Sequence, residues 1–99
     1  MIKVSIVIVN YNTAQLTMRL LQSLTGYDAL ESMEIIVVDN ASVDESKAVI
    51  RANFPSIKWI QNTENIGFGR AVNIAVAQAN GAIVIVLNSD LIFKNPACS

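Results

Sequence analysis

Four short, strand-like runs recur along the chain, and each one ends in a cluster of polar residues. The runs cover residues 4–9, 35–38, 57–60 and 82–87. They are rich in valine and isoleucine, which is typical of strands buried on both faces of a sheet. A chain of 99 residues with 53% apolar and 15% charged side chains can bury one core. The pattern therefore predicts one globular domain built on a sheet.

Helical patterns separate the four runs. Each has apolar or small residues at helical spacing between a capping residue and a stop signal. The caps and stops are Thr13 and Gly26 for the first helix, Ser42 or Asp44 and Phe54-Pro55 for the second, and about Gly69 and Asn80-Gly81 for the third. Alternation of strands and helices predicts an α/β fold with three layers, in which an open, mostly parallel sheet carries helices on both faces.

In a parallel sheet, the carboxyl ends of all strands lie at one edge. The four polar clusters are therefore expected to share that edge, where ligands bind at the point at which the strand order reverses. We interpret the clusters as the wall of one ligand crevice.

Charge and cysteine content restrict the partners. Seven basic and eight acidic side chains give a net charge of −1, and no run of Lys or Arg predicts a nucleic-acid partner. The single cysteine, Cys98, cannot form a disulfide within the chain and fits a cytoplasmic setting. The longest apolar stretch, residues 82–87, is too short to cross a bilayer, so no transmembrane segment is expected.

The first two clusters suit recognition of a nucleotide base. In Asn10-Tyr11-Asn12, the tyrosine ring can stack on a base, although the tripeptide also fits an ordinary turn. Asp39 directly follows an apolar strand, where its carboxylate can accept an N–H from uracil, thymine or guanine. The alternative is a cap or turn role for Asp39, although Ser42 and Asp44 are better placed for capping.

The third cluster has two glycines around an aromatic residue at a helix entrance. Such glycines let backbone N–H groups approach a ligand, or simply form a tight turn, and the pattern does not separate these roles. The segment is Asn65-Ile66-Gly67-Phe68-Gly69, and the nearby Arg70 and Asn73 can reach phosphate or sugar unless they are ordinary solvated residues.

The fourth cluster, Asn88-Ser89-Asp90, offers the hard oxygen ligands that Mg²⁺ or Mn²⁺ prefers. The chain has no Gly-x-x-x-x-Gly-Lys loop, and no Lys or Arg lies in the first, second or fourth cluster to neutralise a diphosphate. A divalent cation held by Asp90 is the predicted substitute, and a plain turn after the strand is the alternative.

Taken in order, the four clusters resemble the amino-terminal half of a family 2 glycosyltransferase, a GT-A fold that uses nucleotide-sugar donors. The resemblance covers nearly the whole chain. It rests on Val7-Ile8-Val9-Asn10-Tyr11-Asn12, Val38-Asp39-Asn40-Ala41-Ser42 with Asp44, Asn65-Ile66-Gly67-Phe68-Gly69 with Asn73, and Leu87-Asn88-Ser89-Asp90.

The resemblance implies a role for each cluster. The implied nucleotide-binding residues are Val9, Asn10, Tyr11, Asp39, Asn65, Gly67 and Asn73, and the implied donor and metal motif is Asn88, Ser89 and Asp90. Asp90 matches the last Asp of the family's Asp-x-Asp motif. Asn88 stands in place of the first one, as in the Leu-Asn-x-Asp variant of rhamnosyltransferase-like members, and its uncharged amide weakens the expected affinity for metal.

The resemblance also implies an activity for the complete enzyme. It would transfer a hexosyl group, with inversion, from a UDP-, dTDP- or GDP-sugar to a hydroxyl of a glycan or lipid-linked acceptor in cell-wall or polysaccharide biosynthesis. Such an enzyme would be cytoplasmic or peripheral at the inner face of the membrane. The general base and most of the acceptor site are expected beyond Ser99, so residues 1–99 are expected to form the donor-binding portion of a truncated domain and to be inactive alone.

Three other classes of protein have related sequence patterns. A non-catalytic module of the same fold, which only binds or assembles, is compatible with the missing base and with Asn88. A receiver domain needs an acidic pair after the first strand, and a dehydrogenase needs Gly-x-Gly-x-x-Gly there, whereas the chain has Asn-Tyr-Asn-Thr-Ala. An exposed edge of a truncated sheet also predicts a homo-oligomer formed through that edge.

Overall fold

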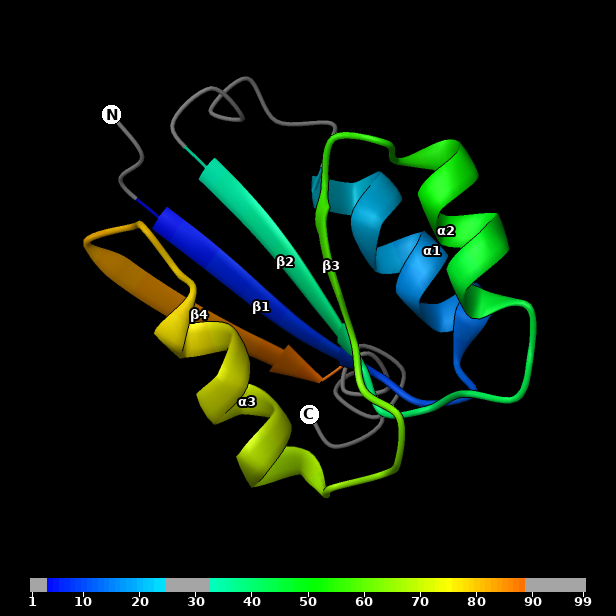
Figure 1. Ribbon diagram of the computed structural model, residues 1–99. Helices are drawn as coiled ribbons and strands as arrows, with labels where there is room; N and C mark the ends of the chain where they lie inside the picture. Colours follow the sequence, from blue (N-terminus) through cyan, green and yellow to red (C-terminus); the bar gives the residue numbers. More distant parts are fainter. Residues whose placement is uncertain (1–3, 25–32, 89–99) are drawn as a thin grey trace, which may run out of the picture.

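In a computed structural model that describes residues 4–24 and 33–88, a parallel sheet lies between two layers of helices (Figure 1). The order along the chain is β1 (Val4–Asn10), α1 (Ala14–Leu24), β2 (Met33–Asp39), α2 (Ser46–Asn53), β3 (Lys58–Gln61), α3 (Phe68–Ala77) and β4 (Ile83–Asn88). This alternation confirms the predicted α/β fold, and each strand lies within two residues of its predicted position.

The four strands are hydrogen-bonded in the order β3-β2-β1-β4, and every pair is parallel. The chain moves outward from β1 to β3 and then returns to the other side of β1 with β4. The strand order therefore reverses between β1 and β4, which is where open α/β sheets bind their ligands. The carboxyl ends of the strands converge at one edge in Figure 1.

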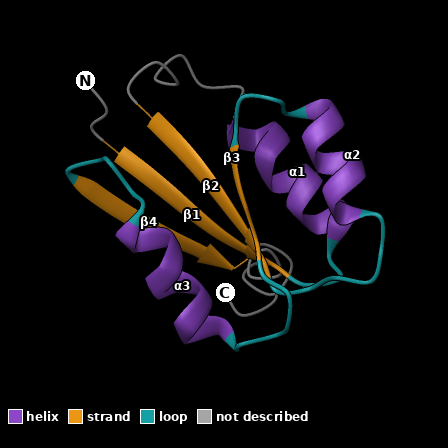
Figure 2. Ribbon diagram, in the orientation of Figure 1, coloured by secondary structure: helices purple, strands orange, loops and turns teal. Residues whose placement is uncertain are grey.

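The two faces of the sheet carry different helices (Figure 2). Successive side chains of β1 and β2 point to opposite faces, so both strands are buried on both sides. The core beneath α1 and α2 consists of Ile6, Ile8, Leu20, Leu21, Ile35, Val37 and Ile50. The core beneath α3 consists of Val7, Val9, Ile36, Val38, Ala71 and Ala75. The expectation of helices on both faces is thus confirmed.

The end of α3 differs from the prediction. The helix ends at Ala77, and Asn80-Gly81 forms the turn into β4 instead of the helix stop. Asn80 is held there because both its backbone N–H and its side-chain amide donate to Glu34, at 2.8 and 3.0 Å. The predicted stop of the first helix, Gly26, lies outside the described residues.

These contacts belong to a cluster of polar contacts at the amino-terminal edge of the sheet, which we call the clasp. It consists of Ser5, Glu34, Lys58, Asn80 and Gly81. Ser5 donates to Glu34 at 2.6 Å and accepts the backbone N–H of Gly81 at 2.8 Å. Lys58 lies 3.8 Å from the Glu34 carboxylate. A Cβ at position 81 would lie 2.6 Å from the backbone nitrogen of Ser5, so this close approach requires glycine. The clasp fixes the start of β4 against β1 and β2.

Within residues 4–24 and 33–88, no helix has the length and apolar character needed to cross a membrane.

Candidate functional site

The candidate site begins with Asp39, the last residue of β2, whose side chain is 1% exposed. Oδ1 accepts hydrogen bonds from Asn10 Nδ2 at 2.7 Å and from Ser42 Oγ at 2.6 Å. Oδ2 accepts the backbone N–H of Ser42 and the side-chain amide of Gln61, both at 2.9 Å. From the sequence we expected a carboxylate free to accept hydrogen bonds from a ligand. Instead, four protein donors surround it.

Burial and hydrogen bonding have opposite effects on the charge of Asp39. Burial raises the pKa of its carboxyl, because it disfavours the ionised form. The hydrogen bonds from Ser42, Asn10 and Gln61 stabilise the ionised form and outweigh burial, so the pKa lies below its ordinary value. Asp39 is therefore a carboxylate at neutral pH, which can accept but cannot donate hydrogen bonds.

Asn10, the last residue of β1, is fully buried and orients the Asp39 carboxylate. While its amide nitrogen donates to Asp39, its oxygen accepts Thr17 Oγ1 at 2.6 Å and Thr13 Oγ1 at 3.0 Å. Both threonines come from the start of α1, which therefore fixes the Asn10 amide in one orientation. Thr13 was predicted as the cap of this helix, and its backbone oxygen does accept the N–H of Thr17 at 2.9 Å.

The loop after β2 is tied to the loop after β1. Ser42 Oγ accepts the backbone N–H of Asn12 at 2.8 Å, and Asn12 Oδ1 accepts the backbone N–H of Val43 at 2.8 Å. Asp44 accepts from both the backbone N–H and the hydroxyl of Ser46 at the start of α2. Its second oxygen lies 3.4 Å from the backbone nitrogen of Ala14 at the start of α1. Ser42 and Asp44 were the two residues proposed to cap the second helix. Asp44 forms hydrogen bonds with the first turn of α2, whereas Ser42 donates hydrogen bonds to Asp39.

The third cluster is joined to the end of β2 through Asn40, which is 3% exposed. Asn40 Nδ2 donates to the backbone oxygen of Gly67 at 3.1 Å, and its Oδ1 accepts Asn62 Nδ2 at 3.0 Å. Asn65 Oδ1 accepts the N–H of Gly67 at 2.9 Å. Gly67 has a φ of 86° at the entrance of α3, a conformation that favours glycine. Gly67 therefore forms the turn before α3, whereas Gly69 lies within the helix.

Two further predicted residues lie apart from the buried network. Tyr11 is 46% exposed beside Asn10, so its ring is accessible for stacking. Asn73 is exposed on α3, two residues after buried Ala71 and two before buried Ala75. Helical geometry therefore directs Asn73 away from the sheet. The side chain of Val9 is buried in the core, so only its backbone can meet a ligand.

The fourth cluster is described only at its first backbone position. Asn88 ends β4, and the register places Val9 of β1 beside it, next to the reversal of strand order. Ser89 and Asp90 lie outside the described residues. Within the described part of the chain, no group of three or more His, Cys, Asp or Glu residues could hold a metal ion. Asp39 does not fit a metal either, because protein donors occupy its carboxylate.

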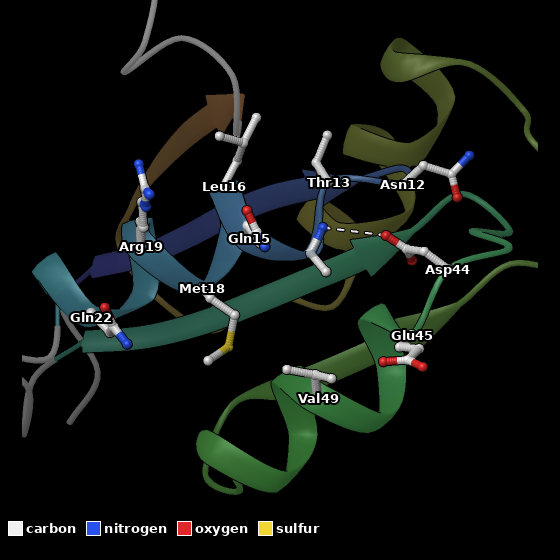
Figure 3. Close-up of a pocket in the computed structure, with 11 residues that line it drawn as sticks. Asn12, Thr13, Gln15, Leu16, Met18, Arg19, Gln22, Asp44, Glu45 and Val49 are labelled. Carbon is white, nitrogen blue, oxygen red and sulfur yellow. Dashed lines mark hydrogen bonds between the residues drawn. The ribbon is translucent and has the colours of Figure 1, made fainter.

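A separate groove of about 920 Å³ runs between α1 and α2 (Figure 3). Its walls include Asn12, Gln15, Leu16, Met18, Asp44, Glu45 and Val49. The groove touches the first cluster only through Asn12 and does not contain Asp39 or Asn10. Ligand binding in α/β sheets follows the carboxyl edge of the strands, so we place the candidate site at that edge and not in this groove.

Three residues of the site were not identified as such from the sequence. Gln61 and Thr17 bond directly to Asp39 and Asn10, and Asn40 joins two loops. Thr17 interrupts the leucine pattern of its helix with a hydroxyl on the buried face, which was a usable signal. Gln61 had no such signal, because its role depends on the pairing of β3 with β2.

The family model for glycosyl transferase family 2 matches residues 5–98. ExoO, a succinoglycan biosynthesis protein of Rhizobium meliloti, is 32% identical over 88 residues, which are 88% of this chain and 25% of ExoO. TarS of Staphylococcus aureus, a poly(ribitol-phosphate) β-N-acetylglucosaminyltransferase, is 32% identical over 94 residues, which are 91% of this chain and 16% of TarS. The chain thus spans a quarter or less of these two relatives.

Solved structures are similar as well. The mannosyltransferase PcManGT of Pyrobaculum calidifontis, in complex with GDP-Man and Mn²⁺, has a TM-score of 0.81 and 29% identity, and the match covers 89% of this chain and 27% of PcManGT. Residues 1–349 of S. aureus TarS, in complex with UDP-GlcNAc, have a TM-score of 0.82 and 28% identity, and the match covers 98% of this chain and 30% of that TarS fragment. With a family match over nearly its whole length and this shared architecture, the chain belongs to glycosyl transferase family 2.

Proposed function

We propose that this chain is the donor-binding portion of an inverting glycosyltransferase, which moves a sugar from a nucleoside diphosphate to an acceptor hydroxyl. The observation that carries the proposal is the position of Asp39. An ionised carboxylate lies at the carboxyl end of β2, one strand away from the reversal of strand order. The accessible Tyr11 directly follows Asn10, the register partner of Asp39. Membership of the family supports the same function.

Asp39 would recognise the base by accepting its ring N–H, which uracil, thymine and guanine carry and cytosine and adenine lack. The exposed ring of Tyr11 would stack on the base, and the backbone of Val9 and Asn10 would supply further polar groups at its edge. Asn65 and Gly67 would also contact the nucleotide, and Asn73 would do so through a part of the ligand that reaches the outer side of α3. Structures similar to this chain hold GDP-Man and UDP-GlcNAc, so UDP-, dTDP- and GDP-sugars all remain candidates.

Asn88, Ser89 and Asp90 would contact the diphosphate, with Asp90 holding Mg²⁺ or Mn²⁺. The oxygen donors of this tripeptide fit such a cation, and a similar structure holds Mn²⁺. When bound, the cation would neutralise charge on the departing diphosphate. The backbone of Asn88 lies beside Val9, so a diphosphate at this point would be close to a base held by the first cluster.

The acceptor hydroxyl would be activated by a general base located beyond Ser99 and would attack the anomeric carbon from the face opposite the diphosphate. We propose a glycan or lipid-linked acceptor. The finer predictions of a rhamnosyltransferase-like donor, of cytoplasmic residence, and of peripheral attachment to the inner face of the membrane rest on the sequence alone.

A non-catalytic module is the second candidate, because four protein donors already occupy Asp39 and a purely structural carboxylate has that property. The two candidates differ in whether Asp39 accepts a ligand.

Thermal melting of the chain with UDP, dTDP and GDP, each with Mn²⁺ and with EDTA, tests the proposal. Binding at 100 times Kd stabilises the fold by about 2.7 kcal/mol. Each kcal/mol moves the melting temperature of a domain of this size by about 4–8 °C. We expect at least one nucleotide to raise the melting temperature, and EDTA to reduce the rise.

The matched variants are Asp39→Asn and Glu34→Gln. Both remove a hydrogen-bonded carboxylate from one edge of the sheet, but Glu34 lies at the edge opposite the proposed site. Asp39→Asn should eliminate the nucleotide-induced rise, whereas Glu34→Gln should keep it. Equal rises in the two variants would contradict a base-binding role for Asp39.

A further inference from the structure

The Asp39 carboxylate has no acceptor position left for a ligand. A carboxylate offers about four lone-pair positions. Two of them receive Asn10 Nδ2 and Ser42 Oγ, and the other two receive Ser42 N and Gln61 Nε2. If Asp39 binds a base, as the proposed function requires, one of these donors must leave.

Gln61 is the donor that can leave most easily. Its side chain is exposed, whereas Asn10 is fully buried and Ser42 is partly buried. Asn10 is also held by two threonine hydroxyls, and Ser42 donates to Asp39 from both its backbone and its side chain. Gln61 makes a single bond to Asp39, from the end of β3, where the two residues are register partners.

Two other contacts fix the orientation of the Gln61 amide. Its oxygen accepts Trp59 Nε1 at 3.0 Å, so the nitrogen end faces Asp39. The nitrogen also donates to the backbone oxygen of Asn62 at 2.9 Å. An amide nitrogen has two N–H groups. One can stay on Asn62 while the other leaves Asp39 and points to whatever replaces it.

We infer that Gln61 is a second base-recognition residue. A ring N–H of the base takes the place of Gln61 on Asp39 Oδ2, and the released N–H of Gln61 donates to the carbonyl next to that ring N–H. Uracil and thymine have a carbonyl on each side of this N–H, and guanine has one beside it. One hydrogen bond is broken and two are made, so opening the Asp39 network does not leave a polar group unpaired.

The first test replaces the amide and keeps the side-chain shape. Gln61→Met removes the donor, and Gln78→Met makes the same change at the exposed end of α3, near the opposite edge of the sheet. Calorimetric titration with UDP, dTDP and GDP identifies the nucleotide that binds most tightly. For it we expect Gln61→Met to raise Kd by about threefold to tenfold, the usual effect of one hydrogen bond. Gln78→Met should leave Kd unchanged.

A thio-substituted nucleotide tests the contact with the carbonyl. Sulfur accepts hydrogen bonds poorly, so 2-thio- or 4-thio-UDP, 4-thio-dTDP or 6-thio-GDP should bind the unmodified chain more weakly than the parent nucleotide. In Gln61→Met the same substitution should have no further effect, because the partner of that carbonyl is already missing. A purely structural role for Gln61 would leave the effect of sulfur the same in both proteins.

Trp59 provides an independent signal, since it is the only tryptophan of the chain. Nucleotide binding should change its fluorescence in the unmodified chain, because the Gln61 amide that accepts the Trp59 indole N–H changes its own hydrogen-bond partner. The fluorescence change should be smaller in Gln61→Met. Gln61→Glu is a second variant of the same shape that also lacks a donor, and it should bind more weakly still because it places a second negative charge beside Asp39.

The outcomes separate this inference from the proposed function. If nucleotide binds, Asp39→Asn prevents binding, and Gln61→Met binds as tightly as the unmodified chain or more tightly, then Gln61 only competes with the ligand and the inference is wrong. If no nucleotide binds the unmodified chain, the proposed function is wrong and the inference fails with it. Weaker binding by Gln61→Met together with loss of the thio effect supports the inference.

Discussion

Asn10 and Asp39 are register partners at the carboxyl ends of β1 and β2, and Asn10 Nδ2 donates to Asp39 Oδ1 at 2.7 Å. Both side chains are buried, and no buried side-chain nitrogen or oxygen in the described residues lacks a hydrogen-bond partner. A polar pair in this position is stable only because it is fully satisfied. Its removal should therefore affect stability as well as ligand binding.

Asp39→Asn should lower the free energy of unfolding. The asparagine amide nitrogen would face other donors in place of an acceptor, and an unsatisfied buried group costs about 1–3 kcal/mol. Urea denaturation at pH 7 measures the loss. An unchanged midpoint would mean that the network rearranges freely around position 39.

Thr17→Val should lower the stability by about 1 kcal/mol, because it removes the shorter of the two hydrogen bonds to the buried oxygen of Asn10 and keeps the side-chain shape. Thr63→Val makes the same change at an exposed position and should be nearly neutral. Urea denaturation of the two variants compares them directly. Equal stabilities would show that Asn10 does not depend on Thr17.

Acid should destabilise the fold through Asp39 and Glu34. Burial acts to raise the pKa of the Glu34 carboxyl, but hydrogen bonds from Asn80 and Ser5 and the charge of Lys58 outweigh it, so its pKa is lowered, as for Asp39. Because the unfolded chain binds these protons first, the stabilisation is present above the ordinary pKa values and is lost as the pH falls through the lowered ones. Stability should fall below about pH 5, the region in which carboxylates of this kind are protonated.

The dependence on pH should be weaker in Asp39→Asn and in Glu34→Gln, and weakest in the double variant. Denaturant midpoints measured from pH 7 to pH 2.5 would show this. Parallel curves for all four proteins would contradict the lowered pKa values.

Gly81→Ala should destabilise the clasp at the amino-terminal edge. The new Cβ would lie 2.6–2.7 Å from atoms of Val4 and Ser5, and overpacking of this kind costs about 1–3 kcal/mol. Gly69→Ala is the control, because a Cβ at position 69 would meet no atom within 4 Å and alanine favours a helix over glycine by about 1 kcal/mol. In thermal melting, the melting temperature should fall for Gly81→Ala and rise for Gly69→Ala.

The outer strand β4 should promote self-association. It is paired with β1 on one side, and Ile83, Val84, Ile85 and Val86 are between 36% and 59% exposed. Exposed apolar edge strands pair with one another, and an introduced lysine prevents this. Sedimentation of the chain should reveal association that increases with concentration and that Ile85→Lys reduces. A monomer at all concentrations would contradict the predicted homo-oligomer.

The alternation of strands and helices was predictable because it depends on local patterns. Residues 4–9 and 35–38 are almost continuously apolar, and only a strand buried on both faces suits such runs. The end of α3 was predicted wrongly, because Asn80 and Gly81 are local stop signals whose actual partners, Glu34 and Ser5, are distant in the chain. Local pattern cannot anticipate such contacts.

The candidate site was predictable in position but not in detail. Asp39 and Asn10 follow apolar strands, so their place at the carboxyl edge followed from the fold. The sequence did not predict that protein donors occupy every acceptor position of the Asp39 carboxylate. One of these donors, Gln61, comes close to Asp39 only because β3 pairs with β2. The outward direction of Asn73 depends on which face of α3 meets the sheet, and that face is defined by Ala71 and Ala75.

The location of nucleotide binding is the central claim, and NMR titration of the ¹⁵N-labelled chain with UDP, dTDP and GDP tests it most directly. We expect one of them to shift the backbone amides of Asn10, Tyr11, Asn40 and Asn62, together with the indole signal of Trp59. The amides that line the groove between α1 and α2, such as Gln15 and Val49, should not move. Shifts confined to that groove, or no shifts with any of the three nucleotides, would contradict a donor site built around Asp39.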